Sequence, residues 1–233
     1  MKKYFLLYIF VCLTIWSCGD TTIPKNNTSK QTTTTIEKTA NPSTTATATD
    51  KKKKVVFFGD SLTAAYGLDE DQGFTSLIQK KIDSLDLDYE VVNAGLSGET
   101  TAGGNSRIDW ILKQPIDIFI LELGGNDGLR GIDPDASFKN LQSIINKVKA
   151  KYPAAKIVLA GMEAPPNMGD DFTSEFRAMF PKLAKANNTA LIPFLLDSVG
   201  GIPELNQPDG IHPTAKGHQI VAETIWKVLK EVL

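Results

Sequence analysis

Short apolar runs alternate with longer amphipathic segments from Lys54 to the end of the chain. Five runs predict strands, and four of them are apolar and β-branched enough to be buried on both faces. They span residues 54–59, 89–93, 116–123, 156–161 and 190–195. Helical patterns lie near residues 74–85, 101–112, 134–152, 173–187 and 214–233. This alternation predicts an α/β domain of parallel βαβ units, with a sheet covered on both sides.

A different pattern precedes this domain. The first eighteen residues have two lysines, then an apolar run from Tyr4 to Trp16, then Ser17 and Cys18. A basic start, a short apolar core and a small residue at the cleavage point are typical of an export signal. The core is shorter than the roughly 20 apolar residues that a transmembrane helix needs.

The end of this segment, Ile-Trp-Ser-Cys, resembles the cleavage box of bacterial lipoproteins, although Trp16 is bulkier than the usual residue. The resemblance implies that residues 1–18 are a lipoprotein signal peptide and that Cys18 carries the lipid; an uncleaved signal anchor is the alternative. Cys12 and Cys18 are the two cysteines of the chain, so cysteine chemistry is not expected in the folded domain.

Residues 19–53 predict a disordered tether. Twelve threonines lie between positions 20 and 53, and Ile23 and Ile36 are the large apolar residues there. Such a segment cannot bury enough apolar surface to offset its chain entropy. Its end-to-end distance would be roughly 30 Å, enough to hold a domain at 54–233 away from a membrane surface.

Charge is distributed unevenly along the chain. Residues 1–53 contain eight lysines and three acidic residues, whereas the remainder has 17 Lys and Arg against 24 Asp and Glu. Binding to nucleic acid needs clustered basic residues that displace counterions. The acidic body therefore argues against a nucleic-acid partner.

Candidate chemistry lies where the predicted strands end, which is where open parallel sheets bind their ligands. Ser61 follows the first strand, and Gly-rich turns with free backbone N–H groups follow the second and third. Asp209 and His212 stand three residues apart before the last helix. The domain has two histidines, and His212 on a loop is a better base for Ser61 than His218, which lies within the predicted helix.

Each of these signals is weak alone, but their set and order resemble the SGNH, or GDSL-type, hydrolases. The whole of residues 54–233 is similar to the arylesterase and multifunctional thioesterase/lysophospholipase branch. The similarity lies in GDSLTAAYGL, VVNAGLSGETTAGG, LELGGNDGLRG, GMEAPPNMG, FP before KLA, PFLL and DGIHPTAKGH. It implies a flavodoxin-like three-layer α/β/α sandwich with a five-stranded parallel sheet.

The resemblance also implies roles for individual residues. Ser61 would be the nucleophile, His212 the general base and Asp209 the residue that orients the imidazole. Such a base is needed because a serine hydroxyl is a weak nucleophile, and imidazole titrates near neutral pH. The backbone N–H groups of Ser61 and Gly98 and the side-chain amide of Asn126 would form the oxyanion hole. Gly98 is preferred to Gly95 because the family motif has Ser-Gly before an acidic residue and threonine.

The implied function is hydrolysis of acyl esters through an acyl-enzyme, by a monomer without metal or cofactor, anchored in the bacterial cell envelope and facing the periplasm or at the outer membrane. Met168 and Phe172 replace tyrosines common in this branch, which makes the expected acyl groove more apolar. Two alternatives on the same fold stay open, a carbohydrate O-acetyl esterase and a non-catalytic glycan-binding lipoprotein. A nucleotide binder is disfavoured because the chain has neither G-x-G-x-x-G nor a Walker loop, and a metal hydrolase because H-E-x-x-H is absent. The G-x-S-x-G elbow of α/β-hydrolases is absent too.

Overall fold

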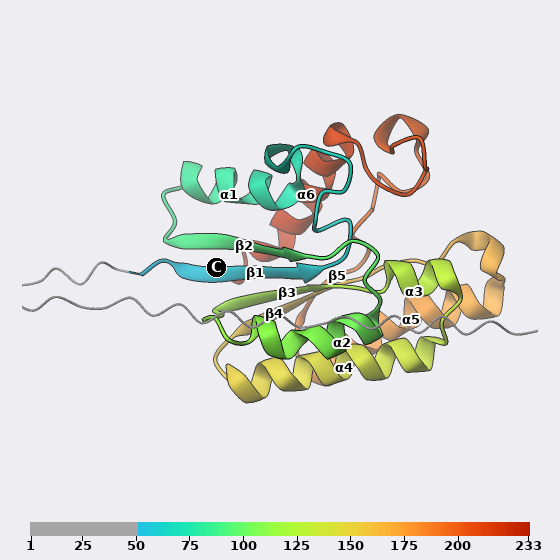
Figure 1. The fold of residues 1–233 in the computed structure, drawn as a ribbon, viewed down its shortest axis with the longest axis horizontal. Helices are drawn as coiled ribbons and strands as arrows, with labels where there is room; N and C mark the ends of the chain where they lie inside the picture. The colour runs from blue at the N-terminus through green and yellow to red at the C-terminus, as the bar shows by residue number, and fades with distance from the viewer. Residues whose placement is uncertain (1–50) are drawn as a thin grey trace, which may run out of the picture. The chain divides into compact units, whose positions relative to one another are not determined.

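A parallel sheet of five strands forms the middle layer of the structure (Figure 1). The structure is a computed structural model that describes residues 51–233, so the predicted signal peptide, Cys18 and nearly all of the predicted tether lie outside the described residues. In spatial order the strands are β2 (Tyr89–Gly95), β1 (Lys53–Gly59), β3 (Ile118–Glu122), β4 (Lys156–Ala160) and β5 (Ala190–Ile192). This order, 2-1-3-4-5, confirms the predicted flavodoxin-like α/β class.

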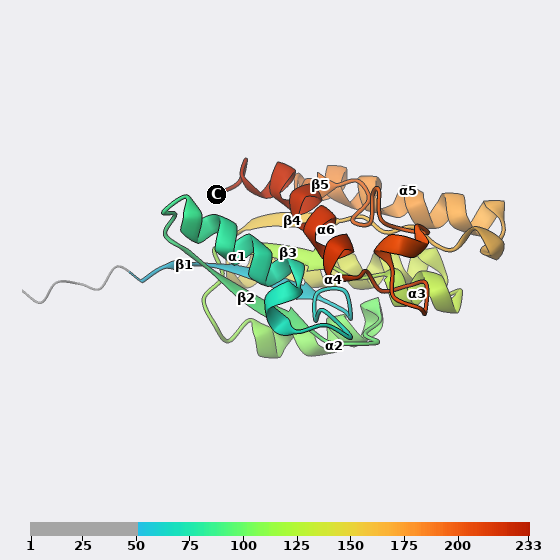
Figure 2. The same ribbon diagram turned by 90° about the horizontal axis from the view of Figure 1, so that it is seen from above.

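Helices cover both faces of the sheet, as Figures 1 and 2 show. One face is covered by α1 (Phe74–Ser84) and α6 (Ala215–Leu229), which contact each other. The other is covered by α2 (Thr101–Ile111), α4 (Pro134–Lys151) and α5 (Asp170–Asn187). The short α3 (Gly125–Arg130) lies at the end toward which the strand arrows point. Single-turn 3₁₀ segments occur at Glu70–Gln72, Pro166–Met168 and Pro203–Leu205.

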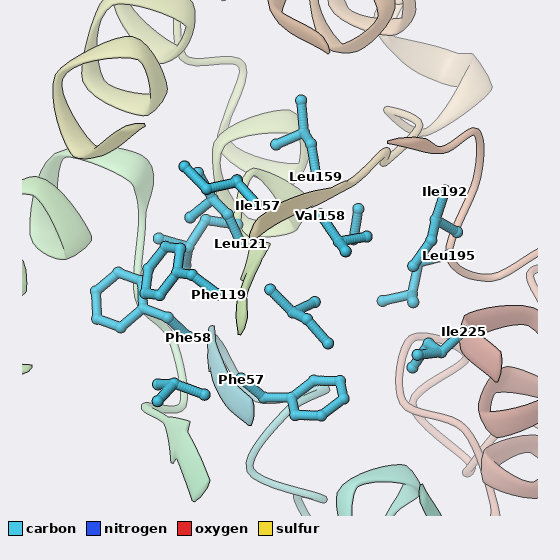
Figure 3. Packing of buried hydrophobic residues seen from close by; sticks show 14 of the residues in the cluster. Phe57, Phe58, Phe119, Leu121, Ile157, Val158, Leu159, Ile192, Leu195 and Ile225 are labelled. Atoms are coloured by element: carbon cyan, nitrogen blue, oxygen red, sulfur yellow. The ribbon is translucent and has the colours of Figure 1, made fainter. Parts of the chain in front are cut away.

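Successive side chains of β1 pack against the helix layers on opposite faces of the sheet. Phe57 and Phe58 are both fully buried, but successive strand residues point to opposite faces of the sheet (Figure 3). The ring of Phe57 lies 5.7 Å from that of Phe74 at the start of α1. Phe58 lies 5.7 Å from Phe119 of β3 and 4.3 Å from the guanidinium of Arg107 in α2. A continuous apolar run is therefore required in β1, because both of its faces are covered.

The strand register brings the carboxyl ends of β1, β2 and β3 to the same level of the sheet. Gly59, the last residue of β1, pairs with Gly95 of β2 on one side and with Glu122 of β3 on the other. The turns that follow these strands therefore lie together, at the point where the strand order reverses. The chain ends at the opposite edge, where Lys156 at the start of β4 donates to the backbone oxygen of Val232 at 2.6 Å (Figure 1).

Two elements differ clearly from the sequence prediction. The helix α3 was not predicted, because its glycine-rich sequence also suits a loop. The strand β5 ends at Ile192 rather than at residue 195, since Pro193 has no N–H to continue the ladder.

Candidate active site

The structure brings Ser61, His212 and Asp209 into one chain of contacts. Ser61 follows β1, whereas the other two lie in the long loop between β5 and α6. Nε2 of His212 lies 2.9 Å from Oγ of Ser61, and its Nδ1 lies 2.7 Å from Oδ2 of Asp209. These two contacts use both ring nitrogens, so the imidazole is held in line between the carboxylate and the hydroxyl.

Local hydrogen bonds fix the loop that carries this pair. Oδ1 of Asp209 accepts the backbone N–H of Ile211 at 2.9 Å and that of His212 at 3.0 Å. Gly210, between Asp209 and Ile211, has φ of 71°, a conformation that suits glycine. The hydrogen bond to the side chain of His212, followed by those two backbone N–H groups, lowers the pKa of Asp209 to about 2. Asp209 is therefore an anion throughout the neutral range.

An aromatic side chain lies against the imidazole. The ring of Tyr66, which is half exposed, has its centroid 4.6 Å from that of His212. Gln207 links the two loops, since its Nε2 donates to the backbone oxygen of Tyr66 at 2.7 Å. These contacts hold the loop of Tyr66 against the loop that carries His212.

The second histidine of the domain has a packing role. His218 is 1% exposed within α6, and its Nδ1 accepts the backbone N–H of Phe74 at 3.2 Å. Its ring is stacked on that of Phe74. Burial, assisted by the charge of His212, lowers the pKa of His218 to about 4 and keeps it neutral.

The three predicted oxyanion donors come from the turns after β1, β2 and β3. Among the hydrogen bonds of residues 51–233, the backbone N–H of Ser61 and that of Gly98 have no acceptor. Nδ2 of Asn126 donates one N–H to Oδ2 of Asp60 at 3.0 Å, which leaves its second N–H available. The geometry thus offers three donors with capacity for a substrate oxygen.

Two carboxyl groups that sequence reasoning did not assign lie beneath the turn of Ser61. Oε2 of Glu122 accepts Oγ1–H of Thr63 at 2.7 Å and the backbone N–H of Asp60 at 3.2 Å. Oε1 of Glu122 is buried without a partner among the described residues. Burial raises the pKa of Glu122 well above its usual value, with a contribution from Asp60, and raises the pKa of Asp60 itself to about 6.

A third buried acidic residue, Asp127, lies next to Asn126 and links the helices around it. Asp127 accepts the backbone N–H of Thr101 at 2.9 Å, its hydroxyl at 2.6 Å and the hydroxyl of Ser137 at 2.9 Å. It therefore connects the first turns of α2, α3 and α4. One sequence signal could have revealed these buried carboxyl groups. An acidic residue within or just after an apolar strand, such as Glu122 at the end of IFILE in β3, is buried with the strand and therefore needs a buried hydrogen-bond partner.

Neither a spanning helix nor a metal cluster occurs in the described part of the chain. No helix within residues 51–233 is long and apolar enough to cross a bilayer. No group of three or more His, Cys, Asp or Glu side chains in that range is arranged to hold a metal ion.

Comparison with known proteins gives one consistent answer. The model of the GDSL-like lipase/acylhydrolase family matches residues 57–220. The chain is 42% identical over 176 residues to the esterase TesA of Pseudomonas aeruginosa, which covers 75% of this chain and 87% of that protein. It is 36% identical over 180 residues to the thioesterase 1/protease 1/lysophospholipase L1 of Escherichia coli, which covers 77% and 84%. A crystal structure of TesA matches with a TM-score of 0.75 at 40% identity, covering 78% of this chain and 100% of that one.

Proposed function

Since the chain belongs to the GDSL-like lipase/acylhydrolase family and is a carboxylic ester hydrolase, we propose that Ser61, His212 and Asp209 are its catalytic triad. One observation carries the proposal: the imidazole of His212 contacts the hydroxyl of Ser61 on one side and the carboxylate of Asp209 on the other. A serine hydroxyl becomes a nucleophile when such an oriented base can take its proton.

The proposed reaction has two halves. Oγ of Ser61 attacks the carbonyl carbon of the ester while its proton passes to Nε2 of His212. The proton then moves to the leaving alcohol or thiol, the bond to that group breaks, and the acyl group remains on Ser61. Water attacks this acyl-enzyme as His212 takes one of its protons, and the carboxylic acid leaves as the proton returns to Ser61. Asp209, an anion because of its low pKa, stabilises the imidazolium.

The oxyanion of each tetrahedral intermediate would be held by the N–H groups of Ser61 and Gly98 and by the amide of Asn126. The two backbone N–H groups have no acceptor in the described residues, and Asn126 has one N–H left after its bond to Asp60, which supports this role. Preorganised donors of this kind are each worth roughly 2.7–4 kcal/mol in the chemical step. The steps use side chains of this chain and water, so we propose neither a metal nor an organic cofactor.

The acyl chain would lie along the apolar surface beside α3. Phe172 stacks on the buried Phe176 at 5.9 Å, and Met168 is close enough that a side chain at Gly131 would meet its methyl group. Both residues are half-buried. Aryl esters, lysophospholipids and acyl thioesters are the proposed substrate classes, with support from the names of the relatives.

We place this enzyme in the bacterial cell envelope, as a lipid-anchored monomer that faces the periplasm or lies at the outer membrane. The support is the sequence around Cys18 and the Thr-rich segment 19–53, both upstream of the domain. Cys18→Ser should move the protein from the membrane fraction to the soluble fraction while its esterase activity persists. Unchanged partition would support an uncleaved signal anchor instead.

A fluorophosphonate probe tests the triad directly, because it labels only an activated serine. We expect mass spectrometry to find the adduct on the peptide of Ser61, and Ser61→Ala to abolish labelling. Labelling of another serine in the Ser61→Ala variant would refute the assignment.

A substrate panel tests the ester class with the same purified protein. It compares p-nitrophenyl esters of increasing chain length with acyl-CoA, a lysophospholipid and an acetylated glycan. Turnover confined to the acetylated glycan would replace the proposal with a carbohydrate O-acetyl esterase.

A further inference from the structure

Arg130 contacts two of the three proposed oxyanion donors. It is the last residue of α3, one helical turn after Asn126. Its Nη2 donates to the backbone oxygen of Gly98 at 3.1 Å and, over a longer distance of 3.4 Å, to Oδ1 of Asn126. We propose that Arg130 is a positioning residue that holds both donors in their productive orientation. The inference rests on the proposed function, in which Gly98 and Asn126 donate to the substrate oxygen.

The contact with Asn126 selects one orientation of an amide that can otherwise flip. Only the nitrogen end of the amide can donate to a negatively charged oxygen. Nδ2 of Asn126 donates to the Asp60 carboxylate, and Arg130 donates to Oδ1. A flipped amide would turn its oxygen toward that carboxylate and its NH₂ group toward the guanidinium. Both contacts would then be repulsive, so Arg130 and Asp60 together keep the free N–H directed at the substrate.

The contact with Gly98 fixes a turn. Gly98 has φ of 79°, and the N–H of Glu99 closes the turn on the oxygen of Leu96 at 3.1 Å. Glycine adopts this conformation freely and leaves it as freely. Because Arg130 binds the carbonyl oxygen of Gly98, rotation of this turn would break a charge-assisted hydrogen bond. The N–H of Gly98 is therefore kept free of internal partners.

The charges around Arg130 indicate that its proposed role depends on its hydrogen bonds rather than on its positive charge. It is the one Lys or Arg in the segments that follow the five strands, residues 60–73, 96–100, 123–133, 161–169 and 193–214. Those segments contain eleven acidic residues: Asp60, Asp69, Glu70, Asp71, Glu99, Asp127, Asp133, Glu163, Asp197, Glu204 and Asp209. One positive charge does not reverse the sign of this edge. A guanidinium, however, has five N–H donors in a planar fork and can serve two acceptors at once.

The test uses the full-length enzyme and a neutral ester, p-nitrophenyl butyrate. Arg130→Ala should lower kcat about 10-fold or more, because small displacements of catalytic groups have effects of this size, with KM changed less than about two-fold. Arg130→Lys should recover part of the loss. Millimolar guanidinium should partly restore Arg130→Ala, whereas sodium chloride at the same ionic strength should not.

Arg177→Ala is the matched control, because Arg177 is also an exposed arginine and pairs with Glu163 away from both donors. We expect its kcat to equal that of the parent. Arg130 is exposed as well, so its removal leaves no buried group unpaired and the melting temperature should change little.

Asn126→Ala, alone and combined with Arg130→Ala, separates the inference from the proposed function. If Arg130 acts through Asn126, its substitution should matter much less in the Asn126→Ala background. A normal kcat for Arg130→Ala beside a low kcat for Asn126→Ala would overturn the positioning role and leave the proposed function intact. A normal kcat for Asn126→Ala would refute the oxyanion assignment, and with it the inference. A raised KM with normal kcat in Arg130→Ala would make Arg130 a substrate-binding residue and would also overturn the inference.

Discussion

Asp209 and Glu122 are both acidic residues near Ser61, but they lie in opposite environments. The side chain of Asp209 is 38% exposed and accepts hydrogen bonds from the side chain and backbone of His212, which lower its pKa to about 2. Glu122 is 1% exposed beneath the turn of Ser61, where burial raises its pKa well above the usual value. The solvent side of Ser61 is thus built to keep a charge, and the interior side disfavours one.

The two environments correspond to two roles, the proposed reaction on the solvent side of Ser61 and structural support on the interior side. On the solvent side, His212 contacts both Ser61 and Asp209 and is the proposed proton carrier, while Asp209 supplies a fixed negative charge. On the interior side, Glu122 accepts the backbone N–H of Asp60 and the hydroxyl of Thr63, and so fixes the position of the turn that carries Ser61. Substitutions on the solvent side should therefore change rates most, and those on the interior side should mainly change stability.

His212→Ala should have the largest effect, because it removes the proposed base. We expect kcat to fall about 10⁴-fold or more, with little further loss in the double variant with Ser61→Ala, since members of such a unit fail together. His218→Ala is the control: it should lower the melting temperature, because the buried ring packs on Phe74, while kcat of the folded enzyme stays near normal. Equal losses of kcat in the two variants would contradict the choice of base.

Asp209→Asn should be milder than the loss of the base. The imidazole keeps its contact with Ser61 but loses the carboxylate that favours the imidazolium, so the loss of kcat should be roughly 10- to 100-fold smaller than in His212→Ala. Steady-state kinetics with the neutral ester measure this loss. A variant with parental kcat would show that the loop alone orients His212.

The pH dependence of stability should have opposite signs on the two sides. A lowered pKa, as for Asp209, stabilises the fold above about pH 4 and loses this effect as pH falls through about 2. A raised pKa, as for Glu122, stabilises the fold below its ordinary value of 4.5 and loses this effect as pH rises.

Glu122→Gln should therefore gain stability relative to the parent between about pH 5 and pH 8, by a few degrees in melting temperature. Asp209→Asn should lose stability relative to the parent near pH 6, and the difference should vanish near pH 2. Thermal melts across this range measure both. Parallel pH curves for Glu122→Gln and the parent would mean that the pKa of Glu122 is the same in the folded and unfolded protein, and would contradict the raised pKa.

Tyr66→Ala should have the smallest effect. Loss of the ring that faces His212 should lower kcat by roughly 3- to 10-fold, as expected for an aromatic contact of about 1 kcal/mol. Tyr66→Phe keeps the ring and should behave like the parent in the same kinetic assay. If Phe and Ala had equal effects, the hydroxyl rather than the ring face would be responsible.

The residues on the solvent side of the site could be predicted from the sequence, whereas the buried contacts of Glu122 on the interior side could not. Ser61, Asp209 and His212 stand in short local motifs, and the apolar runs before Ser61 predicted a buried strand that ends there. The contact of Asp60 with Glu122 joins residues 62 positions apart, and depends on the register of β1 with β3. A sequence pattern shows that Glu122 ends an apolar strand, but only the folded sheet shows which groups it meets. Arg130 was missed for a similar reason, since α3 itself was not predicted.

Both ends of the described chain lie at the edge of the sheet opposite Ser61, where Lys53 begins β1 and Lys156 contacts the backbone of Val232. A solid support coupled at either end of residues 51–233 would therefore leave Ser61 on the outward side. Neighbouring molecules in a dense layer would then not block one another's substrate access. Turnover per unit area should rise in proportion to the number of molecules immobilised, up to a full monolayer.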